Sequence, residues 1–296
     1  FTSTGGRRAQ AITISNNARK AISVNIKADY INVDVVGLKG QIIYSMYVKA
    51  HFNKSSAYIE KLTDAVRHAA DYVGADADDI LGVGITVPGI LDDEKQILIS
   101  APPLKAKNYD FTKLISAIDY PVVVMNDARA EAYADHWFNG KPQDEKIYIM
   151  LGEGVGGAYI NASAIRNGVH NRGGEFGHMV IHPGGKQCLC GKKGCLEAYV
   201  SEKVLSSELD MTLDNFFELA AQGNKNNSNV LDEYMDNLAL GINNIYTMMD
   251  CDIVLGGTVA PYLKQYESSI KERLVNDYSF DTDADYLRIS DGGGRK

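Results

Sequence analysis

The 296-residue chain has little cysteine, proline or tryptophan, and no long run of apolar residues. It contains 4 cysteines, 7 prolines and 1 tryptophan. So few cysteines argue against a disulfide framework, and we expect reduced thiols in a cytoplasmic protein. A membrane-spanning helix needs roughly 20 apolar residues in succession. None is present, so we expect no membrane partner.

Positive charge is also scarce, because 30 Lys and Arg residues face 38 Asp and Glu residues, for a formal net charge of −8. An acidic body binds nucleic acid poorly by itself. The tyrosines are scattered and form no stacking platform for single strands. A neutral ligand such as a sugar suits this charge better.

Hydrophobic periodicity predicts strands that alternate with helices, which is typical of an α/β layer architecture. Strands are expected at residues 21–27, 30–36, 41–48, 80–87, 121–125, 146–151, 158–161 and 252–255. Helices are expected at residues 55–73, 111–118, 128–137, 196–208, 212–221 and 230–249, and after Gly257 as far as residue 274, with a polar loop at 224–229. Trp137 and Phe138 should close a helix end against the core.

Both halves of the chain follow one plan, a strand pair around a tight turn and then helices that cross to further strands. We therefore expect a duplicated fold with a cleft between the halves near residues 119–125. Residues 21–119 would form a smaller N-terminal α/β domain and residues 120–296 a larger C-terminal α/β domain. Residues 1–20 read as a linker. Because the chain begins at Phe1 and ends in a polar segment, we expect further domains before it and a closing helix after it.

Three of the four cysteines gather in one short stretch. Cys188 and Cys190 are two residues apart, and Cys195 follows five residues later. Three thiolates and one imidazole make a closed tetrahedral Zn²⁺ site, which has a structural role because no position stays open for water. His178 and His182 are both candidates for the imidazole. The alternative is a disulfide pair with incidental neighbours.

Carboxylates that could bind a ligand occur beside the cysteine cluster and at the start of one predicted helix. Glu175 and Glu197 bracket the cysteine cluster, so a metal there would hold the loop that presents them. Asn126 and Asp127 follow a buried strand and begin a helix, where ligands of open α/β sheets bind. The pair is therefore either a helix N-cap or the position of a general base.

The segments GGEFGHM, CLCGKKGCLE and VMNDARAEA together resemble the ROK family (repressors, open reading frames, kinases), over residues 21–260. The resemblance implies a duplicated, actin-like (ribonuclease H-like), two-domain sugar-kinase fold. It favours His178 over His182 as the metal ligand beside Cys188, Cys190 and Cys195. It also implies a sugar site, with Asp127 as the general base in kinase members. The implied sugar-contacting residues are Gly89, Asn126, Asp127, Glu175, His178 and Glu197.

The chain departs from the kinase pattern where phosphates would bind. The expected Asp-x-Gly-Gly-Thr loop corresponds to residues 25–30, which have no glycine and carry Asp29. The expected Gly-Thr-Gly loop is Gly152-Glu153-Gly154. A carboxylate about 4 Å from a phosphate charge costs roughly 4 kcal/mol at an effective dielectric near 20. We therefore expect no kinase activity.

A retained sugar site with a degraded phosphate site is typical of the repressor branch, of the xylose-repressor or N-acetylglucosamine-repressor type. The chain would then bind a monosaccharide effector as a homodimer or homotetramer. It would reach operator DNA through a winged helix-turn-helix before Phe1, with Arg7 and Arg8 close to the DNA. The alternatives are an active sugar kinase with Asp127 as base, and a sugar-binding module with neither activity.

Overall fold

A computed structural model describes residues 13, 15–16, 18–74, 77–140, 144–162 and 164–290. Arg7, Arg8 and the end of the chain after residue 290 lie outside the described residues. The chain divides into two compact units, each described here by itself. Among the described residues, one unit holds those up to Ile85 together with Phe111–Val124, and the other holds Thr86–Asp110 and those from Met125 to Ser290. The boundary expected at residues 119 and 120 stays a prediction, because compactness alone does not define a domain.

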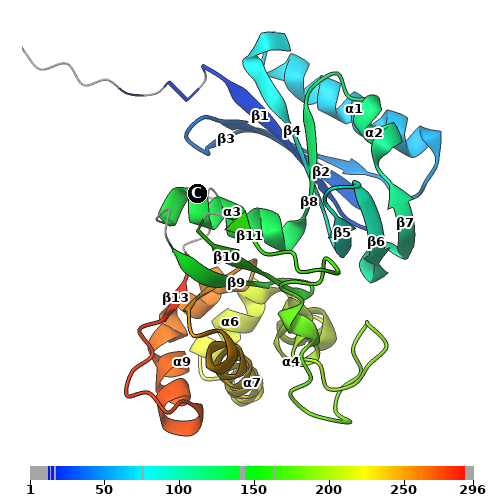
Figure 1. The fold of residues 1–296 in the computed structure, drawn as a ribbon. Coiled ribbons are helices and arrows are strands. Elements are labelled where there is room, and N and C mark those ends of the chain that lie inside the picture. Colours follow the sequence, from blue (N-terminus) through cyan, green and yellow to red (C-terminus); the bar gives the residue numbers. More distant parts are fainter. Residues whose placement is uncertain are drawn as a thin grey trace, which may run out of the picture. The chain divides into compact units, whose positions relative to one another are not determined.

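The sheet of the first unit has five strands in the order β3-β2-β1-β4-β8. Alternating apolar residues of β1, such as Val24, are fully buried, and α1 packs against β1, β2 and β3 (Figure 1). Ser55 begins α1 by accepting a hydrogen bond from the Tyr58 amide. The elements are β1 (Lys20–Ile26), β2 (Tyr30–Gly37), β3 (Ile42–Lys49), β4 (Ile80–Val87), β8 (Val122–Asn126), α1 (Ser56–Tyr72) and α2 (Thr112–Ser116).

The large sheet of the second unit has the order β11-β10-β9-β12-β13. Its central strand β9 pairs antiparallel with β10 and parallel with β12. The strands are β9 (Glu145–Leu151), β10 (Val155–Asn161), β11 (Ala164–Ile165), β12 (Asp252–Gly256) and β13 (Leu287–Ile289). The helices are α3 (Asp127–Asn139), α4 (Glu197–Val200), α5 (Glu202–Leu205), α6 (Leu213–Ala221), α7 (Lys225–Met249), α8 (Ala260–Leu263) and α9 (Glu267–Arg273).

Helices cover both faces of this sheet, with α3 on one face and α6, α7 and α9 on the other (Figure 1). Successive side chains of β9 point to opposite faces of the sheet, so the strand contributes to two separate hydrophobic cores. Ile147 and Ile149 belong to the larger core with α7, whereas Tyr148 packs with Ala132 of α3. Within the described part of the chain, every helix is too short or too polar to span a lipid bilayer.

When the strands are numbered in chain order within each sheet, both of these five-stranded sheets have the order 3-2-1-4-5. The predicted duplication is therefore visible in the topology. A third, antiparallel sheet of short strands was not expected. It consists of β5 (Ile90–Asp92), β6 (Ile97–Ala101) and β7 (Ala106–Asp110) in the second unit.

Three local predictions were wrong. The helix expected at residues 196–208 is interrupted because Ser201 is extended, with φ −74° and ψ 159°. The loop expected at 224–229 is instead the first turn of α7, since the Asn224 side chain caps it. Trp137 and Phe138 are 71% and 54% exposed. The inward face of α3 instead carries residues such as Ala132 and Asp135.

Candidate functional site

The structure brings the predicted metal ligands into one cluster in the second unit. The ligand atoms of His178, Cys188, Cys190 and Cys195 all lie within 4.8 Å of one another. His178 Nδ1 is 3.8 Å from Cys188 Sγ, and Cys190 Sγ is 3.7 Å from Cys195 Sγ. Sulfur ligands about 2.3 Å from a zinc ion at the corners of a tetrahedron would stand about 3.8 Å apart. The cluster therefore fits a tetrahedral metal ion.

Neither His182 as a ligand nor a disulfide between the cysteines agrees with this geometry. The Nε2 atom of His182 lies 2.6 Å from Asn237 Oδ1, and its ring packs edge-on against Tyr199, so His182 is not part of the cluster. The sulfur atoms of Cys190 and Cys195 are well beyond the disulfide bond length of about 2.0 Å. Burial raises the pKa of the Cys188 and Cys195 thiols, and a bound cation would reverse that effect by stabilising the thiolates.

Glycines shape the loop that carries the cysteines. Gly191 and Gly194 have φ of +88° and +83°, values that favour glycine. A Cβ atom on Gly194 would lie 1.8 Å from the His182 carbonyl oxygen. The Gly194 amide donates to the Lys186 carbonyl, and the Gly194 carbonyl accepts from Ile181. This tight return of the chain is what places Cys195 opposite Cys188.

Glu175 and Glu197 both contact the cluster. Glu175 Oε2 is 3.7 Å from His178 Nε2, and Glu197 Oε1 is 3.4 Å from Cys188 Sγ. The second oxygen of Glu197 accepts a 3.0 Å hydrogen bond from the Val155 amide. Burial raises the pKa of Glu175, and the neighbouring His178 opposes that rise. A metal ion in the cluster would thus support the segments that carry both carboxylates.

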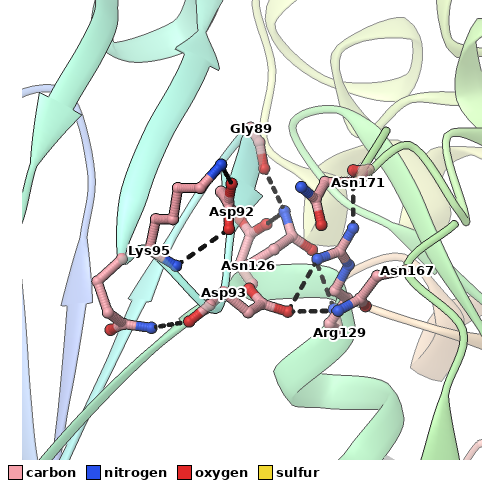
Figure 2. A network of polar contacts seen from close by, with 10 residues as sticks. Gly89, Asp92, Asp93, Lys95, Asn126, Arg129, Asn167 and Asn171 are labelled. Carbon is pink, nitrogen blue, oxygen red and sulfur yellow. Dashed lines mark hydrogen bonds and ion pairs between the residues drawn. The ribbon is translucent and has the colours of Figure 1, made fainter. Parts of the chain in front are cut away.

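Gly89, Asn126 and Asp127 form a second group. The Asn126 side chain caps α3 by accepting from the Arg129 amide at 3.0 Å, and it donates to the Gly89 carbonyl at 3.0 Å (Figure 2). Asp127 Oδ1 lies 3.2 Å from Asn126 Nδ2 and accepts from the Ala128 amide at 3.0 Å. The cap interpretation therefore holds for Asn126, whereas Asp127 stands in the first helical turn at the carboxyl end of β8.

A buried arginine that the sequence did not indicate connects the two groups. Arg129 is only 3% exposed. Its guanidinium donates to Asp93 Oδ2 at 3.1 Å and to the Asn171 carbonyl at 2.9 Å, and Asn167 donates to the same Asp93 oxygen at 2.7 Å. Figure 2 shows how the turn after β5, the start of α3 and the 167–171 loop meet at this guanidinium. Its charge also reaches Glu175, where it opposes the rise in pKa that burial causes.

The first residues of β10 lie between the two groups. A Cβ atom on Gly154 would be 2.8 Å from Glu197 Oε2, and one on Gly156 would be 2.8 Å from the Ala128 Cβ atom. At Gly156 the close approach of α3 favours glycine, whereas at Gly154 a larger residue would have to displace the end of the Glu197 side chain. The start of β10 is therefore flanked by Glu197 and by the first turn of α3.

The two turns expected to be degraded phosphate loops are both acidic. Glu153 is exposed in the turn between β9 and β10. In the other unit, Asp29 follows β1 and its Oδ1 lies 2.8 Å from His51 Nδ1, with both side chains largely exposed. The described turns thus present carboxylates where a phosphate-binding loop would present amide and hydroxyl donors.

A model of the ROK family matches residues 21–288. The chain belongs to the ROK family. It is 29% identical over 262 residues to the xylose repressor of Bacillus subtilis (strain 168). The aligned region covers 86% of this chain and 67% of that protein.

Two solved structures of ROK proteins share the fold. A ROK family transcriptional regulator, a homolog of the E. coli Mlc protein, has a TM-score of 0.79 at 22% identity, over 93% of this chain and 74% of its own. A ROK glucokinase from Streptomyces griseus, solved with glucose and AMPPNP, has a TM-score of 0.78 at 25% identity, over 93% of this chain and 95% of its own. The duplicated two-domain fold of ROK sugar kinases, predicted from the sequence, is confirmed as the fold class.

Proposed function

We propose that this chain is the effector-binding body of a sugar-responsive transcription regulator of the repressor branch. A monosaccharide would bind to Gly89, Asn126, Asp127, Glu175, His178 and Glu197. The observation that carries the proposal is that, in the second unit, side chains suited to a sugar are well supported while the neighbouring turn is unsuited to a phosphate. Two carboxylates supported by the cysteine cluster stand beside a turn in which Glu153 adds negative charge.

The chemistry of these side chains suits a polyol. Carboxylate oxygens accept hydrogen bonds from hydroxyl groups, and such charge-assisted bonds are about twice as strong as neutral ones. Glu175 and Glu197 are held by the same cluster, so little conformational entropy is lost when a sugar binds. The xylose repressor of Bacillus subtilis makes xylose the first sugar to test.

We assign Zn²⁺ to the cluster of His178, Cys188, Cys190 and Cys195. Three thiolates and one imidazole suit zinc and fill all four tetrahedral positions, which leaves none for water, so the ion would be structural. Metal analysis of the purified protein tests this assignment. One zinc per chain is expected, and a chain that folds and binds sugar without metal contradicts it.

Regulation would use operator DNA and a second copy of the chain. A helix-turn-helix before residue 1 would read the DNA, and a homodimer or homotetramer would set the spacing of two such heads. For a sugar to change DNA binding, it must favour one conformation of the protein over another. The full coding sequence and a DNA-binding assay with and without sugar test this step.

A sugar kinase is the second candidate, favoured by the likeness to the Streptomyces griseus glucokinase. Asp127 stands at the carboxyl end of β8 and could take the proton of a sugar hydroxyl. A coupled ADP-release assay over hexoses and pentoses, run beside calorimetry with the same sugars, separates the candidates. Sugar binding without turnover supports the regulator. Turnover of about 1–100 per second that is lost in Asp127→Ala supports the kinase.

A further inference from the structure

A carboxylate outside the proposed sugar site holds the ends of two central strands together. Glu202 begins α5, and its amide donates to the Gly152 carbonyl at 2.7 Å. Its carboxylate accepts a short hydrogen bond from the Thr258 hydroxyl. Gly152 directly follows β9, and Thr258 follows the Gly256-Gly257 pair at the end of β12. Glu202 therefore spans the turns after both strands.

These turns stand where an anion could be held. β9 and β12 are parallel neighbours, with Met150 opposite Gly256, and ligands of α/β sheets bind at the carboxyl ends of such strands. The two turns approach closely, because a Cβ atom on Gly152 would lie 3.7 Å from Thr258 Oγ1. Thr258 is exposed and presents a hydroxyl donor there. In this protein the anion next to that donor is Glu202.

A hydroxyl group has one proton to donate. While Thr258 donates to Glu202, it cannot donate to a phosphate oxygen. A phosphate that displaced the carboxylate from the hydroxyl would remain within a few ångströms of its charge, and at low salt such repulsion lowers affinity by roughly 100-fold. The exposed Glu153 is better screened by water, so its effect should be smaller.

We propose that Glu202 is an internal anion that excludes phosphate-bearing ligands from the turns after β9 and β12. The idea rests on the proposed regulator function and makes it more specific, since it names the residue that separates sugar binding from nucleotide binding. Glu202 would take the place of a phosphoryl group on Thr258. The site would then admit a neutral monosaccharide and reject nucleotides.

The test compares anion binding by wild-type protein and by Glu202→Ala, Glu202→Gln and Glu153→Ala. Mg-ADP and inorganic phosphate are the probes, measured by calorimetry and by ³¹P NMR at low salt. Glu202→Ala should bind Mg-ADP at least 10-fold more tightly than the wild type, and Glu153→Ala should gain less. Adding Thr258→Val to Glu202→Ala should reduce the gain, because the freed hydroxyl can then no longer donate to the phosphate. Glu202→Gln removes the charge but keeps a hydrogen-bond acceptor for Thr258, so its affinity for Mg-ADP should rise less than that of Glu202→Ala. This variant also provides the test if the alanine variant misfolds.

Glu208→Ala is the matched control, because it removes one exposed acidic side chain on the next turn of chain. If Glu202→Ala and Glu202→Gln bind the probes no better than Glu208→Ala, Glu202 is only a structural cap and the proposal is wrong. Micromolar binding of Mg-ADP by the wild type also overturns it. Sugar affinity is measured in parallel on every variant. If the wild type binds no sugar, the proposed function is refuted. The comparison of anion affinities among the variants would still test the role of Glu202.

Discussion

The Nε2 atom of His178 lies 3.7 Å from Glu175 Oε2, while the Nδ1 atom of the same ring faces Cys188 at 3.8 Å. One imidazole therefore contacts both a cysteine of the metal cluster and Glu175, which is proposed to bind the sugar. A bound metal would fix the orientation of the ring, and Glu175 would in turn be placed by the ring. Contacts of this kind typically affect metal affinity or activity 10- to 100-fold.

Metal removal should lower stability and sugar affinity together. Chelation, or Cys190→Ser, is expected to lower the melting temperature and to weaken sugar binding about 10-fold or more, because the loop that presents the carboxylates loses its support. Thermal shift and calorimetry measure the two effects. Cys251→Ser is the control, since this thiol lies outside the cluster. Unchanged sugar affinity in the metal-free protein would refute the coupling.

Neutralising either carboxylate should weaken sugar binding without unfolding the chain. A hydrogen bond to a charged group contributes about 1.5–3 kcal/mol, so Glu175→Gln and Glu197→Gln should each lose about 10- to 100-fold in affinity. Calorimetry measures the affinity, and circular dichroism checks the fold. Glu208→Gln is the matched control on the exposed surface. Wild-type affinity in both variants would remove these residues from the site.

The ion pair between Arg129 and Asp93 should be needed for stability. Asp93→Ala leaves a buried guanidinium without its carboxylate, and breaking such a pair typically costs about 3–5 kcal/mol. Urea denaturation measures the loss. Arg67→Ala breaks an exposed pair with Asp64 and should cost less than about 1 kcal/mol. A similar, small loss in both variants would show that Arg129 is readily satisfied by water.

Asp135 should make stability depend on pH in acid. Burial alone would raise the pKa of this carboxyl group, but hydrogen bonds and charge from Arg288 and Lys146 outweigh burial and lower it. A group with a lowered folded-state pKa stabilises the protein above its unfolded value of about 3.9 and loses that contribution as the pH falls through the folded value. The contribution should therefore be complete at pH 7, begin to decline near pH 4 and be lost as the pH falls further, through the lowered folded-state pKa.

Asp135→Asn tests this expectation. At pH 7 the variant should be less stable by about 3 kcal/mol, because Lys146 stays buried without a counter-charge. The difference between variant and wild type in urea denaturation should shrink as the pH falls from 5 to 3. Using the difference removes the effect of metal loss, which acts on both proteins. A difference that is constant with pH would show that another group controls the acid transition.

The sequence by itself determined the α/β architecture, the duplication and the composition of the metal cluster. Alternating apolar residues determined strands such as β1, and the spacing of Cys188, Cys190 and Cys195 determined a tetrahedral donor set. These features are local, so a short window of residues contains the physical information. The short strands β5, β6 and β7 were missed because each is held mainly by its neighbours in the sheet.

Only the tertiary structure decided which distant residues meet. His178 reaches the cysteines and His182 does not, because Asn237 of α7 holds the second imidazole. Arg129 meets Asp93, 36 residues earlier in the chain, and Glu202 meets Thr258, 56 residues later. Such partners depend on how strands and helices pack, and no sequence spacing encodes a contact between two segments that only the folded sheet brings together.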